Sequence, residues 1–386
     1  PHGVRLVIDS LRWWSQVIGV DGFRFDLAPS LNRTGNMIDS ALFAAIAADP
    51  VLRQLKLIAE PWDISRYSLG EFQYPWREWN DYYRDAVRQF WLDDIARGYG
   101  EGVSALASSF AGSSNIFYFR GPTSSINFIT AHDGFTMNDL VTYHEKRNYP
   151  NSEDNRDGAS TNRSWNVGHE GPTKDPKINQ IRQSLHKSMM ATLLLSSGVP
   201  MITMGDEIGR TQHGSNNAFT LPVDLNHSNW KSRDSWHGGW ALDWNPTDDK
   251  KDLQDAFIEL IRIRQTYLSD ISSEFFTGRV DFGTERKDIA WFSLSGNEMT
   301  DEHWSDGDKR SLTVFLEAGP KNGLVLLMNS FVEETVFTLP SDSWGQNFRC
   351  IFNSFETVAT YNPRIASPGD KVEVSPHSLQ VWLVNR

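Results

Sequence analysis

Three acidic residues, each at the end of a short apolar run, have the types and spacing that glycosidic bond cleavage requires. They are Asp26, Glu60 and Asp133, and the runs span 20–27, 55–59 and 125–131. An ionised carboxylate acting as nucleophile and a protonated carboxylic acid, placed on either side of the bond, cleave it with retention of configuration. A third carboxylate can strengthen its hold on the sugar in the transition state. An acid after a strand is most often a cap or turn residue, so the argument depends on all three occurring together.

The residues next to the first two acids predict different roles for them. Arg24 lies two positions before Asp26, and because side chains alternate along a strand, both face the same side. The guanidinium would hold Asp26 ionised, as a nucleophile requires. Glu60 is closely followed by Trp62, and an apolar indole raises a carboxyl pKa by desolvation, which suits a general acid/base.

The third acid follows a histidine, and this pair has two interpretations. His132 and Asp133 can form hydrogen bonds with sugar hydroxyls. Together with Glu60 they could instead bind a metal ion, but no HxxxH or HxH spacing supports that alternative. No acidic loop of the EF-hand type indicates calcium. The sequence therefore predicts no metal and no cofactor.

Alternating helices and strands position these acids. Helical spacing and composition predict helices over 4–18, 38–48, 86–95, 178–195 and 253–267. Short apolar runs predict strands over 20–26, 55–60, 78–82, 125–134 and 198–207. The parallel strands of a βα repeat present their carboxyl ends on one rim, where barrel enzymes keep their chemistry. The pattern predicts a barrel hydrolase, with the polar loop over 143–176 as a lid or rim of the site.

The sequence pattern changes beyond Asp270. Short alternating or apolar runs separated by turn residues occur at 289–294, 312–316, 323–329, 335–339, 348–352, 372–374 and 379–384. This pattern is typical of an antiparallel β-sandwich. The chain is therefore predicted to contain two domains, over 1–275 and 276–386.

The composition limits the classes of partner. Of the 386 residues, 39% are hydrophobic and 22% charged, and the net charge of −12 leaves no basic field for nucleic acid or an anionic membrane. The 15 Trp, 10 Tyr and 22 Phe include rings that could stack on sugars, so a neutral substrate is expected. Cys350 is the only cysteine, which excludes an intrachain disulfide and a cysteine-based metal site.

The N-terminal residues lack the features of a signal peptide. The sequence starts at Pro1 without an initiator Met or a charged-then-apolar segment. No apolar run reaches the roughly 18 residues that a membrane-spanning helix needs. We therefore expect no membrane partner, and we expect the sequence to begin part-way through a longer protein.

Several motifs resemble a known family. The runs Val20–Asp26, Ala59–Trp62 and Ala131–Gly134 resemble the second, third and fourth signature regions of the α-amylase-type glycoside hydrolases. Within that clan, four longer runs resemble the isoamylase-type glycogen and starch debranching enzymes: Trp79–Asp85, Asp133–Val141, Asn155–Gly158, and Gly205–Glu207 followed by Asn216 and Asn217. These matches extend from the first predicted helix to about Asn217.

The resemblance implies a fold and an activity. The fold would be an α/β (β/α)8 TIM barrel, of which about five strands are present, followed by the all-β sandwich. The activity would be hydrolysis of α-1,6 branch linkages in glycogen, amylopectin or limit dextrin through a covalent glucosyl-enzyme intermediate. By matched position, Asp26 would be the nucleophile, Glu60 the general acid/base and Asp133 the transition-state stabiliser, with Arg24 and His132 as supporting contacts.

Other positions are less well defined by the resemblance. Trp62, Trp79 and Asn80 are candidates for glucan contacts, although each could equally be a packing or loop residue. The family's starch-binding β-domain, first three barrel strands and first signature region are missing, so an isolated chain would leave its inner face and an edge open. We expect an N-terminally truncated chain that is inactive or only binds glucan by itself. The stretch 219–244 is unlike the usual family run, which leaves the preferred substrate length open.

Two other functions use the same features. An α-glucan transferase or a trehalose-releasing relative shares all three acids and differs in its acceptor. A non-catalytic glucan-binding or regulatory subunit would be expected to have lost the acids, and all three are present. One cysteine and no signal peptide are compatible with a bacterial cytoplasm or a plastid. The sequence predicts no oligomeric state.

Overall fold

A parallel sheet of five strands carries the three acids. Its hydrogen-bonded order is β1–β2–β3–β4–β5, and every pair is parallel. The strands are β1 (Gly22–Phe25), β2 (Lys56–Ala59), β3 (Arg77–Asn80), β4 (Ser125–Phe128) and β5 (Val199–Met201). The computed structural model describes residues 2–32, 40–151, 153–218, 247–269, 274–281, 283, 285–319 and 321–385. The five predicted strands are present: β1, β2 and β3 differ from the prediction by one or two residues at each end, whereas β4 and β5 are less than half as long as predicted because bends and turns follow Phe128 and Met201.

Helices connect these strands. They are α1 (His2–Trp13), α2 (Ala41–Ala48), α3 (Asp81–Arg88), α4 (Asp94–Arg97), α5 (Ser104–Phe110), α6 (Ser114–Phe117), α7 (Met137–Leu140), α8 (Pro176–Leu195) and α9 (Asp248–Tyr267). Side chains cap several of them: Ser40 accepts a hydrogen bond from the backbone of Phe43 at the start of α2. A π-helical segment, Trp14–Ile18, extends α1 to Gly19, whose φ of 83° favours glycine. The five predicted helices are confirmed.

The C-terminal residues form an antiparallel β-sandwich. Its strands are β6 (Ile289–Phe292), β7 (Ser311–Glu317), β8 (Asn322–Asn329), β9 (Thr335–Thr338), β10 (Asn347–Asn353), β11 (Ile365–Ala366), β12 (Lys371–Val374) and β13 (Ser378–Asn385). A six-stranded sheet has the order β11–β10–β13–β8–β7–β6, and β12 pairs with β9. The short helix α10 (Asp301–Ser305) lies between β6 and β7 in the chain. The predicted sandwich is confirmed, and only the two-residue β11 was missed because it is too short to show alternation.

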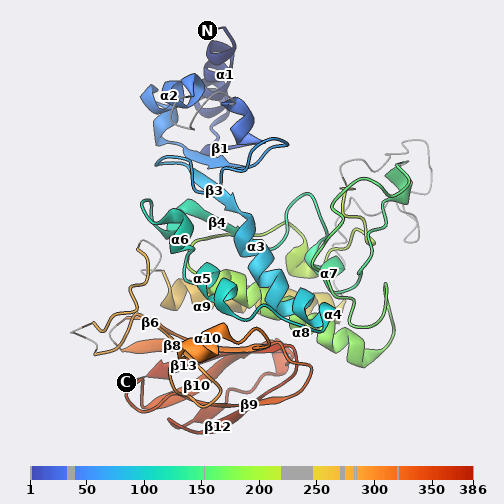
Figure 1. Cartoon of the computed structure of the whole chain (residues 1–386), viewed down its shortest axis with the longest axis vertical. Helices are drawn as coiled ribbons and strands as arrows, with labels where there is room; N and C mark the ends of the chain where they lie inside the picture. The colour runs from blue at the N-terminus through green and yellow to red at the C-terminus, as the bar shows by residue number, and fades with distance from the viewer. Residues whose placement is uncertain are drawn as a thin grey trace.

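Besides a small buried cluster on β3 and β4 themselves (Trp79, Ile126 and Phe128), two larger clusters support the sheet. Leu193 on α8, Leu260 on α9 and Leu326 on β8 belong to one buried cluster that joins the helices to the sandwich. A second cluster, which includes Leu11 and Phe43, packs α1 and α2 against β1 and β2. Figure 1 shows α1 and α2 at one end of the molecule and the sandwich at the other, with β3 and β4 between them. The strand ends that carry the acids therefore rest on two independently packed regions.

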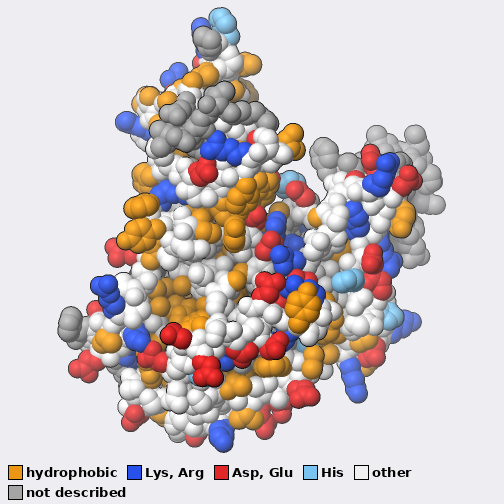
Figure 2. Space-filling model, viewed as in Figure 1, with side chains coloured by type: hydrophobic (Ala, Val, Ile, Leu, Met, Phe, Trp, Pro, Cys, Tyr) orange, Lys and Arg blue, Asp and Glu red, His pale blue; other side chains and the backbone are white. Residues whose placement is uncertain are grey.

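The N-terminal part of the molecule exposes apolar side chains. Leu6, Trp13 and Val17 on α1 and the segment after it are at least half exposed. Within the described residues β1 pairs only with β2, so its other edge has no strand beside it. Figure 2 shows hydrophobic side chains exposed in this part and charged side chains gathered over α3.

No helix among the described residues combines the length and apolarity needed to span a membrane. The stretch 219–244 lies outside the described residues.

Candidate active site

Asp26 and Glu60 follow the adjacent parallel strands β1 and β2, and one arginine contacts both. Arg24 Nη1 donates to Asp26 Oδ1 at 2.6 Å, and its Nη2 lies 3.0 Å from Glu60 Oε2. The same Glu60 oxygen accepts a hydrogen bond from the backbone N–H of Leu27 at 2.7 Å. Because β1 and β2 run in parallel, with Phe25 paired to Ala59, the residue that follows each strand reaches the same edge of the sheet. The structure therefore brings these two acids together.

The two acids differ in their surroundings. The Glu60 residue is only 4% exposed, and burial raises the pKa of its carboxyl group above the usual value. The Leu27 N–H and the Arg24 charge oppose this rise in pKa, and the charge of Asp26 adds to it. The Asp26 side chain is 70% exposed beside the guanidinium. A buried carboxyl group with a raised pKa next to an accessible carboxyl group is the pairing that a retaining glycosidase uses.

Asp133 and His132 follow β4 and lie on the far side of a tryptophan. His132 Nε2 lies 2.7 Å from Asp133 Oδ1, and both side chains are more than half exposed. The Arg24 guanidinium sits over the Trp79 ring at 4.2 Å from its centroid, and the His132 ring centroid is 5.8 Å from that of Trp79. Trp79 therefore lies between Arg24, which contacts Asp26 and Glu60, and His132, which contacts Asp133. Because Trp79 is only 8% exposed, it acts chiefly as a packed side chain.

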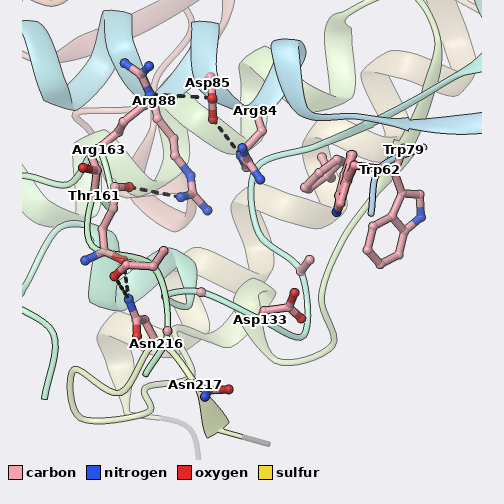
Figure 3. Close-up of a pocket in the computed structure, with 16 residues that line it drawn as sticks. Trp62, Trp79, Arg84, Asp85, Arg88, Asp133, Thr161, Arg163, Asn216 and Asn217 are labelled. Carbon is pink, nitrogen blue, oxygen red and sulfur yellow. Dashed lines mark hydrogen bonds and ion pairs between the residues drawn. The ribbon is translucent and has the colours of Figure 1, made fainter. Parts of the chain in front are cut away.

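A cavity of about 600 Å³ lies beside this link. Figure 3 shows Trp62 and Trp79 on one side of it, and Asp133 between them and a polar wall. That polar wall, together with the residues at its base, consists of Arg84, Asp85, Arg88, Gly134, Gly158, Ala159, Thr161, Asn162, Arg163, Asn216 and Asn217. Trp62 and Trp79 thus border the cavity, as glucan contacts would, whereas Asp26 and Glu60 are not among its lining residues.

Asn80 neither lines the cavity nor contacts the acids. It is fully buried at the end of β3, and its Oδ1 accepts a hydrogen bond from the Tyr83 backbone at the start of α3. Its Nδ2 donates to the hydroxyl groups of Ser113 and Ser125 at 2.9 Å each. The prediction that Asn80 contacts the substrate is therefore corrected: its amide is fully engaged in capping α3 and joining neighbouring segments.

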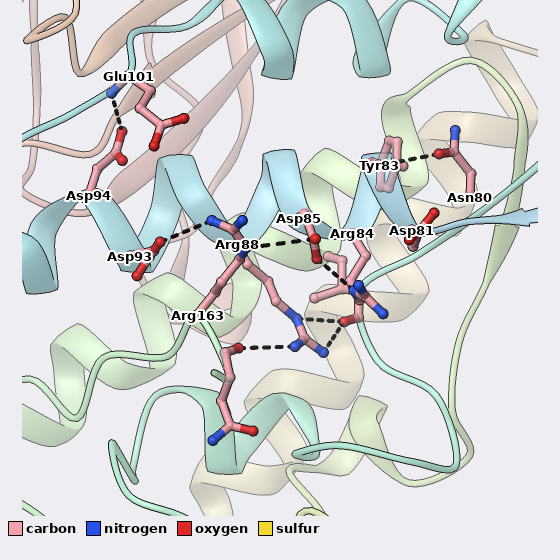
Figure 4. A network of polar contacts seen from close by, with 12 residues as sticks. Asn80, Asp81, Tyr83, Arg84, Asp85, Arg88, Asp93, Asp94, Glu101 and Arg163 are labelled. Carbon is pink, nitrogen blue, oxygen red and sulfur yellow. Dashed lines mark hydrogen bonds and ion pairs between the residues drawn. The ribbon is translucent and has the colours of Figure 1, made fainter. Parts of the chain in front are cut away.

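A row of charged residues on α3, which the sequence analysis did not single out, forms part of the polar wall (Figure 4). Arg84 Nε donates to Asp85 Oδ1 at 2.7 Å. Arg163, from the long loop, lies within ion-pair distance of Asp85 and donates to Asp93 Oδ2 at 3.1 Å. The four-residue spacing of Arg84 and Arg88, which places both on one face of the helix, is the signal that would have found them.

Arg88 is buried at the base of the cavity and binds backbone carbonyls. Its Nε donates to the Ile129 carbonyl at 2.9 Å, and its Nη1 donates to that of Asn162 at 3.0 Å. Burial lowers the pKa of its guanidinium to about 9, and the nearby charge of Arg84 adds to this effect. Arg88 thus joins the segment before Asp133 to the long loop.

Within the described residues, no group of three or more His, Cys, Asp or Glu side chains gathers as a metal site would require.

The chain is similar to known proteins over most of its length. Residues 288–385 match the family model described as "Isoamylase, C-terminal". The chain is 42% identical over 367 residues to a glycogen operon protein GlgX homolog of Mycobacterium tuberculosis, covering 90% of the chain and 48% of that protein. It is 39% identical over 350 residues to a glycogen debranching enzyme of Yersinia pestis, covering 89% and 48%. The chain thus spans about half the length of the curated relatives it matches.

Solved structures are similar in fold across nearly the whole chain. A pullulanase from Anoxybacillus, complexed with maltotetraose, matches with a TM-score of 0.62 at 19% identity, covering 99% of this chain and 46% of that one. The catalytic module of SpuA, a glycogen-degrading pneumococcal virulence factor, matches with a TM-score of 0.64 at 16% identity, covering 99% and 55%. At these identities the likeness concerns the fold.

Proposed function

Because this chain is an isoamylase-type relative of the glycogen debranching enzymes, we propose that its three acids hydrolyse α-1,6-glucosidic branch linkages. The substrate class is a branched α-glucan such as glycogen, amylopectin or a limit dextrin. The chain covers about half of each curated relative, and the activity is proposed for the intact protein.

The observation that carries the proposal is the shared arginine between Asp26 and Glu60. In the first step, Asp26 attacks the anomeric carbon of the branch while Glu60 gives its proton to the leaving glycosidic oxygen, which leaves the branch chain bound to Asp26 as a glucosyl ester and frees the main chain with a 6-hydroxyl group. In the second step, Glu60 takes a proton from water, whose oxygen attacks the anomeric carbon and releases Asp26. The raised pKa of Glu60 supports its role as the proton donor.

Asp133 and His132 stabilise the transition state in this proposal. Asp133 lines the cavity and His132 contacts it, and both side chains are exposed, so that a bound sugar could offer its hydroxyl groups to them. Hydrogen bonds to those hydroxyl groups that strengthen as the ring flattens lower the barrier rather than only improving binding. Trp62 offers an apolar ring to the sugar face.

We also propose that residues 1–275, with the five parallel strands, are the C-terminal portion of a (β/α)8 TIM barrel, followed by a sandwich domain over 276–386. The consecutive strand order and the acids at the carboxyl ends of β1, β2 and β4 support the barrel. The family match over 288–385 supports the second domain. We propose no cofactor, nucleic-acid or membrane partner, and a bacterial cytoplasm or a plastid as the compartment.

The experiment that tests the function measures release of linear chains from glycogen by the intact protein and by its Asp26→Asn variant. Released chains and new reducing ends that disappear in Asp26→Asn support hydrolysis. Transfer of chains without new reducing ends would indicate an α-glucan transferase instead. Glucan binding without release by the unaltered protein would leave a non-catalytic binding subunit as the explanation.

A further inference from the structure

The polar wall of the cavity is held together by side-chain amides that the proposed chemistry does not use. The two amides are those of Asn148 and Asn216, and they meet at Gly158; Asn148 and Gly158 lie ten residues apart on the long loop and Asn216 on a second loop, and we call the three residues the amide clamp. Gly158 ends the motif Asn155–Gly158 that resembles the debranching enzymes, and both Gly158 and Asn216 line the cavity. Both asparagines are at most 1% exposed.

Asn148 is the centre of the amide clamp and uses its whole amide group. Its Nδ2 donates to Asn216 Oδ1 at 2.6 Å and to the Asp157 carbonyl at 3.0 Å. Its Oδ1 accepts from the Asn216 backbone N–H at 3.0 Å and from Ser215 Oγ at 3.1 Å. A buried amide with donors and acceptors all satisfied fixes both its orientation and that of its partners.

Asn216 connects the clamp to the acid at the cavity edge. Its Nδ2 donates to the Ala159 carbonyl and to Asn162 Oδ1, both at 2.8 Å. Its own carbonyl accepts a hydrogen bond of 2.8 Å from the backbone N–H of Gly134, the residue directly after Asp133. One side chain and one carbonyl of Asn216 therefore tie the long loop to the backbone at Asp133.

Gly158 leaves no room for a side chain. It has a φ of +72°, and a Cβ built there would lie 2.2 Å from Asn216 Oδ1 and 2.8 Å from Asn148 Nδ2. Any larger residue must push these two amides apart. Gly168, on the same long loop, has a similar φ of +76° but has no atom within 4 Å of the equivalent position. A side chain would bring the same backbone strain at both glycines, but only at Gly158 would it collide with the amides of the clamp.

We propose that the amide clamp positions Asp133, and that Asn148, Gly158 and Asn216 are positioning residues for the transition state. The inference deepens the proposed function and depends on it, because Asp133 matters only if a sugar ring reacts beside it. The carboxylate of Asp133 is itself largely exposed and contacts His132, so its place depends on the backbone at Gly134 more than on packing of its side chain. Displacing a transition-state group by about 1 Å costs on the order of 10²-fold in rate.

The test compares Gly158→Ala with Gly168→Ala in the intact protein. We expect Gly158→Ala to lower kcat for glycogen debranching by at least ~10-fold, with the Kd for maltotetraose within about 2-fold of the unaltered protein. Gly168→Ala should keep its kcat. Asn148→Asp, which keeps the shape but removes both donated N–H bonds, should show the same loss of kcat and serves if Gly158→Ala does not fold.

Several outcomes would overturn the proposal. An unchanged kcat in both Gly158→Ala and Asn148→Asp would show that the clamp does not control Asp133. An equal loss in Gly168→Ala would attribute the effect to backbone strain. A parallel loss of kcat, maltotetraose binding and melting temperature would indicate a structural role only. Failure of the unaltered protein to debranch would instead remove the proposed function, so the two failures are distinguishable.

Discussion

Glu60 and Glu78 form two buried pairs of acid and arginine on neighbouring strands, and only one of them has the features of a reactive site. Glu60 follows β2 and faces Arg24, while Glu78 lies within β3 and forms an ion pair with Arg120. Burial raises the pKa of both carboxyl groups, that of Glu78 to about 7. The residue types and the burial are alike, so these features do not explain the difference.

The difference lies in what else each carboxylate contacts. Glu78 is fully buried, with Oε2 accepting from the Gly70 N–H at 2.6 Å and Oε1 accepting from Arg120. Both oxygens are therefore occupied in holding a loop and the segment after α6 to the sheet. Glu60 shares its arginine with Asp26, an exposed second acid. A buried acid becomes a candidate catalyst when a second, accessible acid competes for the same guanidinium.

The largest expected effect is a loss of activity on replacing Asp26, the second acid, which has no counterpart beside Glu78. Asp26→Asn should lower kcat for debranching by ~10⁴-fold, because no covalent intermediate can form. The melting temperature should change little, since the side chain is 70% exposed. Asp21→Asn, an exposed acid before the other end of β1, is the matched control and should keep its activity. Substantial activity in Asp26→Asn would remove the distinction between the two pairs.

The next effect concerns the structural pair. Arg120→Met should reduce the free energy of unfolding by about 3–5 kcal/mol at pH 8.5, because it leaves Glu78 buried without its counter-charge. Folding raises the pKa of Glu78 from 4.5 to about 7. Protonation of Glu78 therefore contributes fully to the stability of the folded state below pH 4.5, and this contribution is lost as the pH rises through 7. The cost of Arg120→Met should therefore shrink at pH 5, where Glu78 is protonated. Urea unfolding at the two pH values measures it, and a cost independent of pH would contradict the assignment.

A smaller loss of activity is expected when the planar guanidinium of Arg24 is replaced by an amine. Arg24→Lys keeps the charge but cannot contact Asp26 and Glu60 through two separate nitrogens of one planar group. We expect kcat to fall ~10²-fold through loss of positioning. Arg120→Lys is the matched change in the structural pair and should leave kcat unaltered. Steady-state kinetics on glycogen decide this, and similar losses in both variants would argue against a special role for Arg24.

The smallest effect is a shift in pH dependence. The Arg24 charge lowers the pKa of Glu60 against the larger effect of burial. Arg24→Gln removes that charge, so Glu60 should keep its proton to higher pH and the alkaline limb of kcat/KM should move upward. Arg24→Lys should leave the limb nearly in place. A limb that moves to lower pH in Arg24→Gln would exclude Glu60 as the proton donor.

The sequence by itself determined the elements and the acids at their ends. Alternation and helical spacing predicted β1, β2 and β4, the long helices α8 and α9, and all but one strand of the sandwich. These features are readable because they depend on residues a few positions apart along the chain. The resemblance of the short motifs to the family's signature regions then implied a role for each acid. These motifs are also local, since each spans only a few consecutive residues.

Only the tertiary structure decided which polar residues work together. Asn80 is a buried cap although it stands beside Trp79, and Glu78 pairs with Arg120, which lies 42 positions away. The amide clamp joins Asn148 to Asn216 across 68 positions, within loops whose composition indicated only exposure. The partner of a hydrogen bond or an ion pair depends on which segments the folded sheet brings together, and this information is absent from local patterns.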